Sequence, residues 1–300
     1  MTNKSNQKAA YACNAISGDL EFLRLLEKGS FQGIIHSSFE RTFNVTCLEN
    51  GELYTIAARH LDNGPNTLIT DLDSCSTLEL AVGDRIFVSN KCIKVENKLN
   101  ISIKLAEPWQ CLLPAYPADT ALLKRNIFEA KLFIQEHGQA GGMKKSITTD
   151  NIFQIELARM LEERSRSLVE QLSMSRWESA AQQAVSLIGL GPGLTPSGDD
   201  YLTGLFTVFN MPDSPLWPYR SFCMDVVLHA SKLTNQISCI TMKKAAAGQV
   251  REKIVQFMQA VIHSTSEETK DRLAAVLGIG SSSGTDIALG LIHGLELHLN

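Results

Sequence analysis

The sequence predicts an α+β protein, in which a small antiparallel β barrel or sandwich is followed by a mostly helical domain. Three observations support this fold class. Up to about Pro117, polar and apolar residues alternate in short runs separated by turns. Residues 107–117 hold three of the chain's nine prolines, which indicates a connector. After it the apolar period changes to about 3.6. We therefore expect two domains, residues 1–118 and residues 119–300.

The first part contains a series of strand candidates rich in β-branched and aromatic residues. The longest runs from Gly33 to Cys47, and a turn at 49–52 joins it to residues 53–57 as a hairpin. Closely spaced turns of this kind are typical of small barrels and sandwiches. The later candidates are residues 67–70, 85–89, 92–96 and 101–105.

The second part is expected to be helical because its apolar residues recur at helical spacing. Asp119 is a suitable capping residue for a helix that runs to His137 and ends at Gly138. The later helices are expected to begin at Asp150, to cover residues 176–188, and to cover residues 222–257 with an interruption at Gly248.

Composition and charge narrow the classes of function. Hydrophobic residues make up 44% of the chain and charged residues 20%, which is typical of a packed globular protein. The formal net charge of -4 argues against nucleic-acid binding driven by bulk charge. Aromatic residues make up only 7%, which leaves few side chains for stacking on bases. We therefore expect no nucleic-acid partner.

The expected location is the cytoplasm. No apolar run reaches the roughly 18 residues that a membrane-spanning helix needs, and the first residues lack the apolar core of a signal peptide. The seven cysteines are odd in number, scattered and without a C-x-x-C pair, so we expect reduced thiols rather than a disulfide framework or a zinc site. We also expect no membrane partner.

The most unusual segment is a glycine- and proline-rich run that begins at Gly189. Residues 189–198 include four glycines and two prolines, and an apolar helix is expected to begin near Asp199. A fixed loop before a helix N-terminus presents backbone N–H groups and about half a positive charge to a phosphate or carboxylate. No Gly-Lys-Ser/Thr follows, so the loop is not a Walker loop. The predicted anion-binding residues here are Gly191, Gly193, Thr195, Ser197 and Gly198.

The same design occurs again near the C-terminus. Aligning Ser197 with Ser283 gives Ser-Gly-x-Asp-x-x-x-Gly-Leu in both copies, and each copy follows a Gly-x-Gly. Glycine within a helix costs about 1 kcal/mol relative to alanine, so Gly204 and Gly290 indicate close helix packing. Convergent N-termini would form a two-sided anion site, whereas the alternative is a common capping sequence used twice. The second copy adds Ser283, Gly284 and Asp286 to the predicted binding residues.

Asp199 and Asp200 have two interpretations. Acidic residues in a first helical turn ordinarily interact with the helix dipole. Alternatively, one caps the helix while the other coordinates Mg²⁺ or acts as acid or base beside a bound anion. Adjacent carboxylates repel an anion unless a cation or a proton intervenes. Asp199 and Asp200 are therefore candidate catalytic residues, Mg²⁺ is the cofactor under consideration, and the metal ligands stay unassigned.

A polar stripe lies between the two copies of the motif. Thr234, Ser238 and Thr241 have the spacing i, i+4 and i+7 of one helix face. Such hydroxyls either bond the carbonyls of their own helix or line a site, with Asn235 alongside. Thr234 and Ser238 complete the candidate catalytic residues.

The run from residue 187 to 204, Leu-Ile-Gly-Leu-Gly-Pro-Gly-Leu-Thr-Pro-Ser-Gly-Asp-Asp-Tyr-Leu-Thr-Gly, resembles the signature of the AllH family. The resemblance extends over most of the chain, including the Trp109 connector, the Thr234 region and the loop at 280–290. This family is associated with a subunit of bacterial oxamate carbamoyltransferase. The resemblance implies a role in allantoin and purine nitrogen catabolism, where the enzyme interconverts oxalurate plus phosphate with oxamate plus carbamoyl phosphate. The implied partners are these small anionic substrates and the other carbamoyltransferase subunits.

Three hypotheses follow. The first is a carbamoyltransferase-type subunit, in which the glycine loops bind the anion and stabilise charge at a tetrahedral centre. In it, Asp200 and Asp286 cap helices or hold a metal, while Thr234 and Ser238 orient the substrate. The second is a non-catalytic interaction subunit whose β domain contacts partners. The third is a Mg²⁺-dependent phosphoryl-transfer enzyme that uses Asp199 and Asp200.

Overall fold

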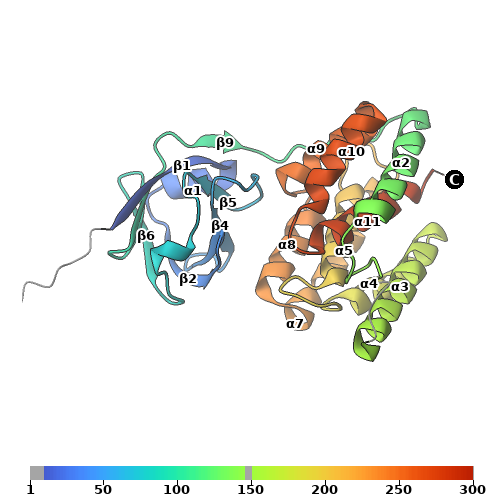
Figure 1. The fold of residues 1–300 in the computed structure, drawn as a ribbon, viewed down its shortest axis with the longest axis horizontal. Coiled ribbons are helices and arrows are strands. Elements are labelled where there is room, and N and C mark those ends of the chain that lie inside the picture. The colour runs from blue at the N-terminus through green and yellow to red at the C-terminus, as the bar shows by residue number, and fades with distance from the viewer. Residues whose placement is uncertain (1–9, 146–150, 300) are drawn as a thin grey trace, which may run out of the picture. The chain divides into compact units, whose positions relative to one another are not determined.

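The computed structural model describes residues 10–145 and 151–299 (Figure 1). The chain divides into two compact units, one that ends at Gln110 and one that begins at Cys111. The division falls ahead of the expected boundary at residue 118 because the connector contacts the helical unit. The Tyr116 N–H donates to the Pro212 carbonyl at 2.7 Å.

The first unit is an eight-stranded β barrel with one additional strand. Its strand order is β5-β4-β3-β2-β6-β7-β8-β1, and β1 also pairs with β5, which closes the barrel. The pairings β1–β8, β1–β9 and β4–β5 are parallel, and the others are antiparallel. The strands are β1 (Tyr11–Asp19), β2 (Gln32–Ser38), β3 (Thr42–Cys47), β4 (Leu53–Ala57), β5 (Thr67–Thr70), β6 (Arg85–Ser89), β7 (Cys92–Val95), β8 (Leu99–Ser102) and β9 (Glu107–Trp109).

The predicted fold class is confirmed, with differences inside the barrel. The run from Gly33 to Cys47 forms two strands instead of one, because the chain turns at residues 39–41 and the Phe39 N–H donates to the Thr42 carbonyl at 2.8 Å. Two further elements are not predicted from the sequence pattern, namely β1 and the following helix α1 (Leu20–Glu27), which buries Phe22 in the barrel core. A short 3-10 helix, η1 (Ser76–Leu78), precedes β6.

The second unit is helical and has its own apolar core. Every helix from α2 to α11 contributes buried residues to this one core. Its elements are α2 (Ala121–His137), α3 (Ile152–Ser173), α4 (Trp177–Leu187), α5 (Ser197–Phe209), η2 (Trp217–Tyr219), α6 (Ser221–Val227), α7 (Ala230–Leu233), α8 (Gln236–Ala246), α9 (Glu252–His263), α10 (Ser266–Leu277) and α11 (Ser283–Glu296).

Helix α5 lies in the middle of this unit. Every one of its residues is buried, and α11 is buried along most of its length. The two helices lie side by side in Figure 1 and pack against each other. A helix that is apolar on all sides requires neighbours all around it. The N-terminus of α5 is therefore held within the core of the unit rather than on its surface.

The expected helix over residues 222–257 is wrong. This region contains four helices, α6 to α9. Thr234 adopts an extended conformation (φ -138°, ψ 176°), and Asn235 begins a new helix by accepting a hydrogen bond from the Ser238 N–H at 3.1 Å. The expected interruption at Gly248 is present, with φ +75°. Apolar spacing alone did not reveal the breaks at the end of α6 and before Asn235.

The first helices of the unit agree better with the sequence. The Asp119 carboxylate accepts a hydrogen bond from the Ala121 N–H at 2.9 Å at the start of α2. Asp150, the expected start of the next helix, lies outside the described residues. Asn151 caps α3 by accepting hydrogen bonds from the Phe153 and Gln154 N–H groups.

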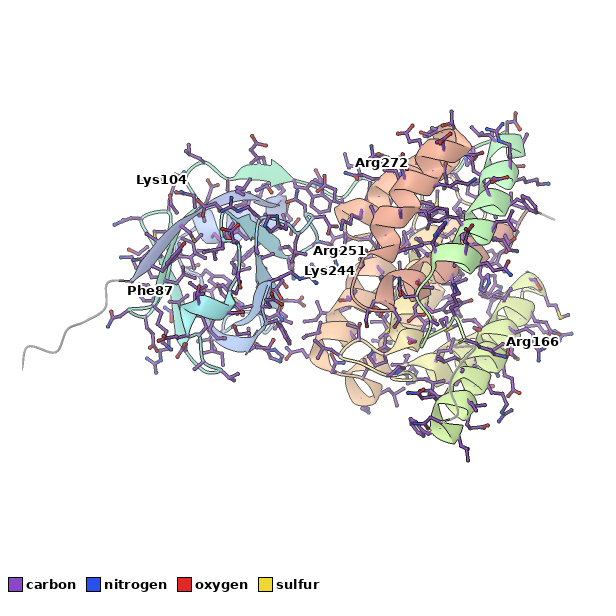
Figure 2. All side chains as sticks on the ribbon, viewed as in Figure 1. Phe87, Lys104, Arg166, Lys244, Arg251 and Arg272 are labelled. Atoms are coloured by element: carbon purple, nitrogen blue, oxygen red, sulfur yellow. The ribbon has the colours of Figure 1, made fainter. Side chains whose placement is uncertain are left out.

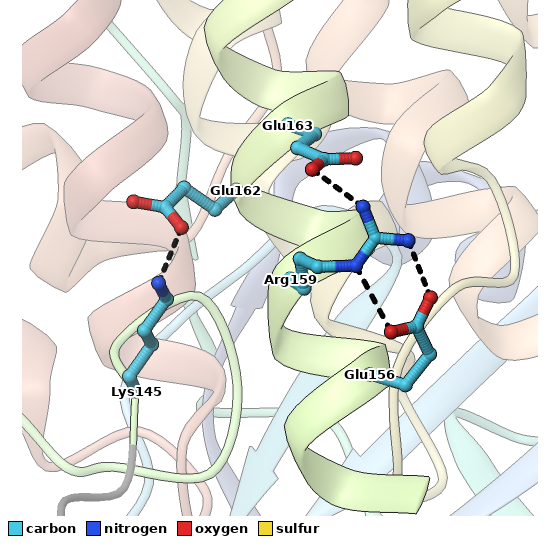
Figure 3. A network of polar contacts seen from close by, with 5 residues as sticks. All are labelled: Lys145, Glu156, Arg159, Glu162 and Glu163. Carbon is cyan, nitrogen blue, oxygen red and sulfur yellow. Dashed lines mark hydrogen bonds and ion pairs between the residues drawn. The ribbon is translucent and has the colours of Figure 1, made fainter.

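Ion pairs cover the outer surface of α3 (Figure 3). Arg159 lies between Glu156 and Glu163, and Lys145 pairs with Glu162. These side chains are about half exposed, so water screens their charges and the pairs contribute little to stability. Figure 2 shows that the labelled Arg166 and Arg272 also lie on the outside of this unit.

No helix among the described residues is both long enough and apolar enough to cross a membrane.

Candidate functional site

The two copies of the loop–helix motif have the same local structure. At the start of α5 the Asp199 and Asp200 N–H groups donate to the Pro196 carbonyl, at 3.0 and 3.2 Å. At the start of α11 the N–H groups of Thr285 and Asp286 donate to the Ser282 carbonyl, at 2.9 and 3.1 Å. Asp200 and Asp286 thus occupy the same position, since each is the fourth residue of its helix.

Glycine residues bring these helices into backbone contact. A Cβ atom on Gly204 would lie 2.1 Å from the Ile287 carbonyl oxygen, and one on Gly290 would lie 2.0 Å from the Tyr201 carbonyl oxygen. Gly204 therefore lies against Ile287, three residues before Gly290, and Gly290 lies against Tyr201, three residues before Gly204. The close packing predicted from these two glycines is confirmed, and it fixes the distance between the helices.

The N-termini of the two helices converge. The Thr195 and Ser283 hydroxyls are 2.8 Å apart, although 88 positions separate them along the chain. This contact agrees with the two-sided arrangement rather than with two unrelated capping sequences. The expectation that Asp200 and Asp286 cap their helices is wrong, because neither helix has a side-chain cap.

The acidic residue of each helix faces a serine of the other. The Ser283 hydroxyl of α11 lies against the Asp200 carboxyl group and lowers its pKa, as does the Thr195 hydroxyl. The Ser197 hydroxyl of α5 lies against the Asp286 carboxyl group and has the same effect on it. Because Ser197 and Ser283 are equivalent in the repeat, the contacts form a reciprocal pair.

Burial outweighs these hydroxyl contacts. Burial, together with the neighbouring charges of Asp286 and Asp199, raises the pKa of Asp200 to about 7. Burial also raises the pKa of Asp286 to about 6, against the lowering effect of the Met143 N–H. A proton is therefore bound within this pair of carboxyl groups over much of the range near neutral pH.

Asp199 has a different environment from Asp200. Its Oδ1 atom accepts a hydrogen bond from the Gly189 N–H at 2.7 Å, and its Oδ2 atom accepts one from the Thr234 hydroxyl at 2.5 Å. Burial raises the pKa of Asp199, and hydrogen bonds from Thr234, Gly189 and Ser238 lower it. Asp199 thus connects the end of α4 to the segment before α8, and its two oxygens are already used.

The predicted polar stripe of Thr234, Ser238 and Thr241 is not a single helix face. Thr234 precedes α8 and contacts Asp199, whereas the Thr241 hydroxyl donates to its own helix at the Ile237 carbonyl. Ser238 is buried, and its hydroxyl faces Asp199, whose pKa it lowers. Of the three, Thr234 and Ser238 lie near the motif, and they contact its structural aspartate.

The glycines of the first loop differ in what they contact. Gly193 is exposed, with φ +94° and open space around it, while Gly191 (φ +128°) lies against Ser197. Gly198 is buried, its N–H donates to the Leu190 carbonyl, and a Cβ atom would lie 2.0 Å from the Leu187 carbonyl oxygen.

Gly284 repeats the arrangement of Gly198. Its N–H donates to the Ile279 carbonyl at 2.9 Å, and a Cβ atom would lie 2.0 Å from the Val276 carbonyl oxygen. The amides of Gly198 and Gly284 are therefore bonded within the protein. A ligand at this site would have to use other groups of the two loops.

The loop after α2 covers the convergent N-termini, and none of its residues is among those predicted from the sequence. The Met143 N–H donates to Asp286 Oδ1 at 2.7 Å, and the Gln139 N–H donates to the Thr285 hydroxyl at 2.8 Å. Gly142 is buried between them, against Asp286 and Ser197. The cluster Gly138, Gly141 and Gly142 was the available signal in the sequence.

No lysine or arginine is among the hydrogen-bond or ion-pair partners of Asp199, Asp200 and Asp286 in the described part of the chain. Nor do the described residues contain a group of three or more His, Cys, Asp or Glu side chains arranged to hold a metal ion. Positive potential at the site comes from the helix N-termini instead. His293 is mostly buried, and its Nδ1 atom is 2.9 Å from the Tyr201 hydroxyl.

The fold and the site define an α+β protein with an N-terminal barrel and a repeated loop–helix motif in its helical unit. Sequence models of one family match both parts. Residues 187–295 match the oxamate carbamoyltransferase subunit AllH, and residues 14–108 match the AllH family N-terminal domain. The chain belongs to the AllH family, as the resemblance in residues 187–204 predicts.

The name of the family indicates a subunit of oxamate carbamoyltransferase, and a subunit implies other subunits in a complex. No solved structure matches the chain.

Proposed function

We propose that this chain is the subunit of a bacterial oxamate carbamoyltransferase that binds the small anionic substrate where the N-termini of α5 and α11 converge. The reaction converts oxalurate and phosphate into oxamate and carbamoyl phosphate, in the cytoplasm, during allantoin and purine catabolism. The observation that carries the proposal is the contact of Thr195 with Ser283 beside two buried, raised-pKa carboxyl groups. Two helix N-termini aimed at one place favour negative charge there.

The buried acids resolve the electrostatic conflict that the sequence raises. Carboxylates beside an anion site repel the anion, but Asp200 has a pKa of about 7 and holds its proton over much of the neutral range. A protonated carboxyl group removes the repulsion and donates a hydrogen bond. This supports the choice of a proton rather than a metal ion between the acid pair and the substrate.

The same proton has a use in carbamoyl transfer. Phosphate oxygen attacks the carbamoyl carbon of oxalurate, the bond from that carbon to the amide nitrogen breaks, and the nitrogen leaves with the electron pair. It needs a proton to depart as oxamate, and an acid with a pKa near the working pH supplies it most effectively. We assign this role of general acid to Asp200, with Asp286 sharing the proton.

The remaining predicted residues then have separate roles. The exposed Gly193 and the adjacent Gly191 present the loop to the anionic end of the substrate, and the hydroxyls of Thr195, Ser197 and Ser283 complete the site. Asp199 and Thr234 position the loop through their mutual hydrogen bond. They are positioning residues in this proposal rather than catalytic ones.

A second candidate is the non-catalytic interaction subunit. It is favoured by the bonding of the Gly198 and Gly284 amides inside the protein, since both loops then serve helix packing. The Mg²⁺-dependent phosphoryl-transfer reading is less well supported, because both Asp199 oxygens accept hydrogen bonds within the protein.

Calorimetry distinguishes the candidates. The purified chain and its complex with the other subunits are titrated with carbamoyl phosphate, oxamate and phosphate. The proposal expects binding that falls at least about tenfold in Ser197→Ala, whereas the control Ser186→Ala, whose hydroxyl bonds its own helix, leaves it unchanged. If neither preparation with intact Ser197 binds any of these compounds, the interaction subunit is the better description. Unchanged affinity on adding Mg²⁺ rejects the phosphoryl-transfer reading.

A further inference from the structure

A surface groove lies where η2 and α6 meet the C-terminal end of α8. Trp217, Arg220 and Met224 line the groove from η2 and α6, and Ala246 and Ala247 line it from α8. The two helices pack against each other. The groove has a volume of about 520 Å³, which gives room for side chains of a partner.

Large apolar side chains are exposed beside this groove. Trp217 and Met224 are 38% and 43% exposed, although side chains of these kinds are mostly covered in folded proteins. Leu228, one turn after Met224 along the same face of α6, is 74% exposed. Single exposed apolar residues are normal, whereas a contiguous group of them marks an interaction site. We name Trp217, Arg220, Met224 and Leu228 the α6 patch.

Aromatic contacts hold this surface in a fixed arrangement. The Arg220 guanidinium carbon lies 4.5 Å from the centre of the Trp217 ring, and its Nη1 atom donates to the Trp217 carbonyl at 3.1 Å. Next to them, Tyr219 stacks on Trp177 of α4, which contacts the buried Phe209. Side chains that are already ordered lose less conformational freedom on binding. Trp and Arg residues in such settings carry much of the binding energy of protein interfaces.

The charge around the patch differs in sign from that of the whole chain. The chain has a formal net charge of -4, but residues 217–251 contain five Lys and Arg residues and one acidic residue, Asp225. Arg220 lies in the groove itself, and Lys244 lies three residues before Ala247, on the same side of α8. Complementary charge steers partners together and excludes wrong ones. The surface therefore fits a partner with acidic residues around a large apolar side chain.

We propose that the α6 patch is the docking surface for another subunit of the complex, through a segment that carries acidic residues and places an apolar side chain in the groove. The family name implies other subunits and assigns them no surface on this chain. The inference goes beyond the proposed function and does not depend on the anion site.

The affinity of the purified chain for the remaining subunits tests this surface. Trp217→Ala removes the anchor of the patch, and Leu228→Glu places a negative charge against the acidic partner. Each is expected to weaken binding at least tenfold. The matched controls Phe128→Ala and Leu132→Glu change exposed apolar residues of α2, and they should leave the affinity unchanged. Circular dichroism checks that the variants fold, and the mostly exposed Leu228 decides the test if Trp217→Ala does not.

The dependence of binding on salt tests the charge of the partner. Arg220→Glu is expected to weaken binding and to make it less sensitive to salt, because an attraction between opposite charges is lost. Arg166→Glu, an exposed position on α3, is the control (Figure 2). Binding that stays as tight in Arg220→Glu as in the control overturns the assignment to an acidic partner.

The remaining outcomes separate this inference from the proposed function. Unchanged affinity in folded Trp217→Ala and Leu228→Glu overturns the docking surface, as does a parent chain that binds none of the other subunits. Sedimentation of the chain alone checks for a second copy as the occupant, and a dimer that Leu228→Glu dissociates overturns the proposal. The anion titration with Ser197→Ala judges the convergent N-termini separately, because Ser197 is not part of the α6 patch.

Discussion

The hydroxyls of Thr195 and Ser283 lie 2.8 Å apart and join two copies of one motif. Thr195 belongs to the loop before α5, and Ser283 is the first residue of α11. Their contact brings together two segments that each resemble an ordinary helix start. The position of both hydroxyls depends on how closely α5 and α11 pack behind them.

Alanine at Gly204 or Gly290 is expected to destabilise the helical unit. Each added Cβ would lie about 2 Å from a backbone oxygen of the other helix, so α5 and α11 have to separate. Overpacking costs about 1–3 kcal/mol or more, which exceeds the roughly 1 kcal/mol that alanine gains within a helix. We expect a net loss of about 1–2 kcal/mol in the free energy of unfolding, measured by denaturant titration.

The control for this substitution is Gly278→Ala, whose Cβ meets atoms no closer than 3.6 Å. It should change the free energy of unfolding by less than about 0.5 kcal/mol. Equal stability of Gly204→Ala and the control would contradict the close backbone contact.

Gly198→Val is expected to destabilise the fold, and not only to weaken ligand binding. Gly198 looks like an anion-binding residue in the sequence, but its hydrogen atoms face the Leu187 carbonyl, where a Cβ would lie 2.0 Å away. A β-branched side chain adds further atoms at a helix N-terminus that is fully buried. Thermal unfolding followed by far-UV circular dichroism should show a melting temperature lower by roughly 5 °C or more. A folded variant with an unchanged melting temperature would contradict this packing.

The stability of the protein should fall as pH rises from about 4 to about 7, in part because of Asp200. Its pKa is 3.8 in an exposed chain and about 7 when buried, so the folded state binds more protons than the unfolded state in this window. Asp200→Asn carries no charge at any pH. It is therefore expected to be more stable than the parent at pH 8, by up to about 4 kcal/mol, and nearly equal to it at pH 4.

Denaturant titrations at pH 4, 6 and 8 measure this difference. The exposed Asp271 provides the control, and Asp271→Asn should show the same small effect at each pH. A stability difference between Asp200→Asn and the parent that does not change with pH would show that Asp200 is not neutral in the folded protein.

Thr234→Val should destabilise the protein through Asp199. The substitution keeps the shape of the side chain and removes the hydroxyl that donates to Asp199 Oδ2. A buried carboxylate oxygen then lacks a partner, at a cost of about 1–3 kcal/mol. Thr241→Val is the matched control, because that hydroxyl is exposed and bonds only its own helix. Similar stability of the two variants in a denaturant titration would contradict the role of Thr234.

Much of the site was visible in the sequence because the repeat is visible there. Aligning Ser197 with Ser283 pairs Asp200 with Asp286 and Gly204 with Gly290, and each pair makes equivalent contacts in the structure. The alternation and the turns likewise predicted a barrel or sandwich, since strand period and turn residues are local properties. Local patterns of this kind are read directly from neighbouring residues.

Contacts between distant segments could not be predicted in this way. Met143 reaches Asp286 across 143 positions, and nothing near residue 143 announces that its N–H will meet a carboxylate. The different roles of Asp199 and Asp200 are another example. They are neighbours in sequence and both begin the same helix, but successive helical residues point about 100° apart, so one reaches Thr234 and the other reaches Ser283.

The two copies of the repeat differ at one position that affects the orientation in which a ligand can bind. The residue before each acid of the pair is Asp199 in α5 and Thr285 in α11, so the two flanks of the acid pair differ in charge. A strictly symmetric pair of helix starts would accept a ligand equally well in either of two orientations related by rotation. The exchange of one aspartate for a threonine makes these orientations unequal in energy, which suits a substrate whose two ends are chemically different.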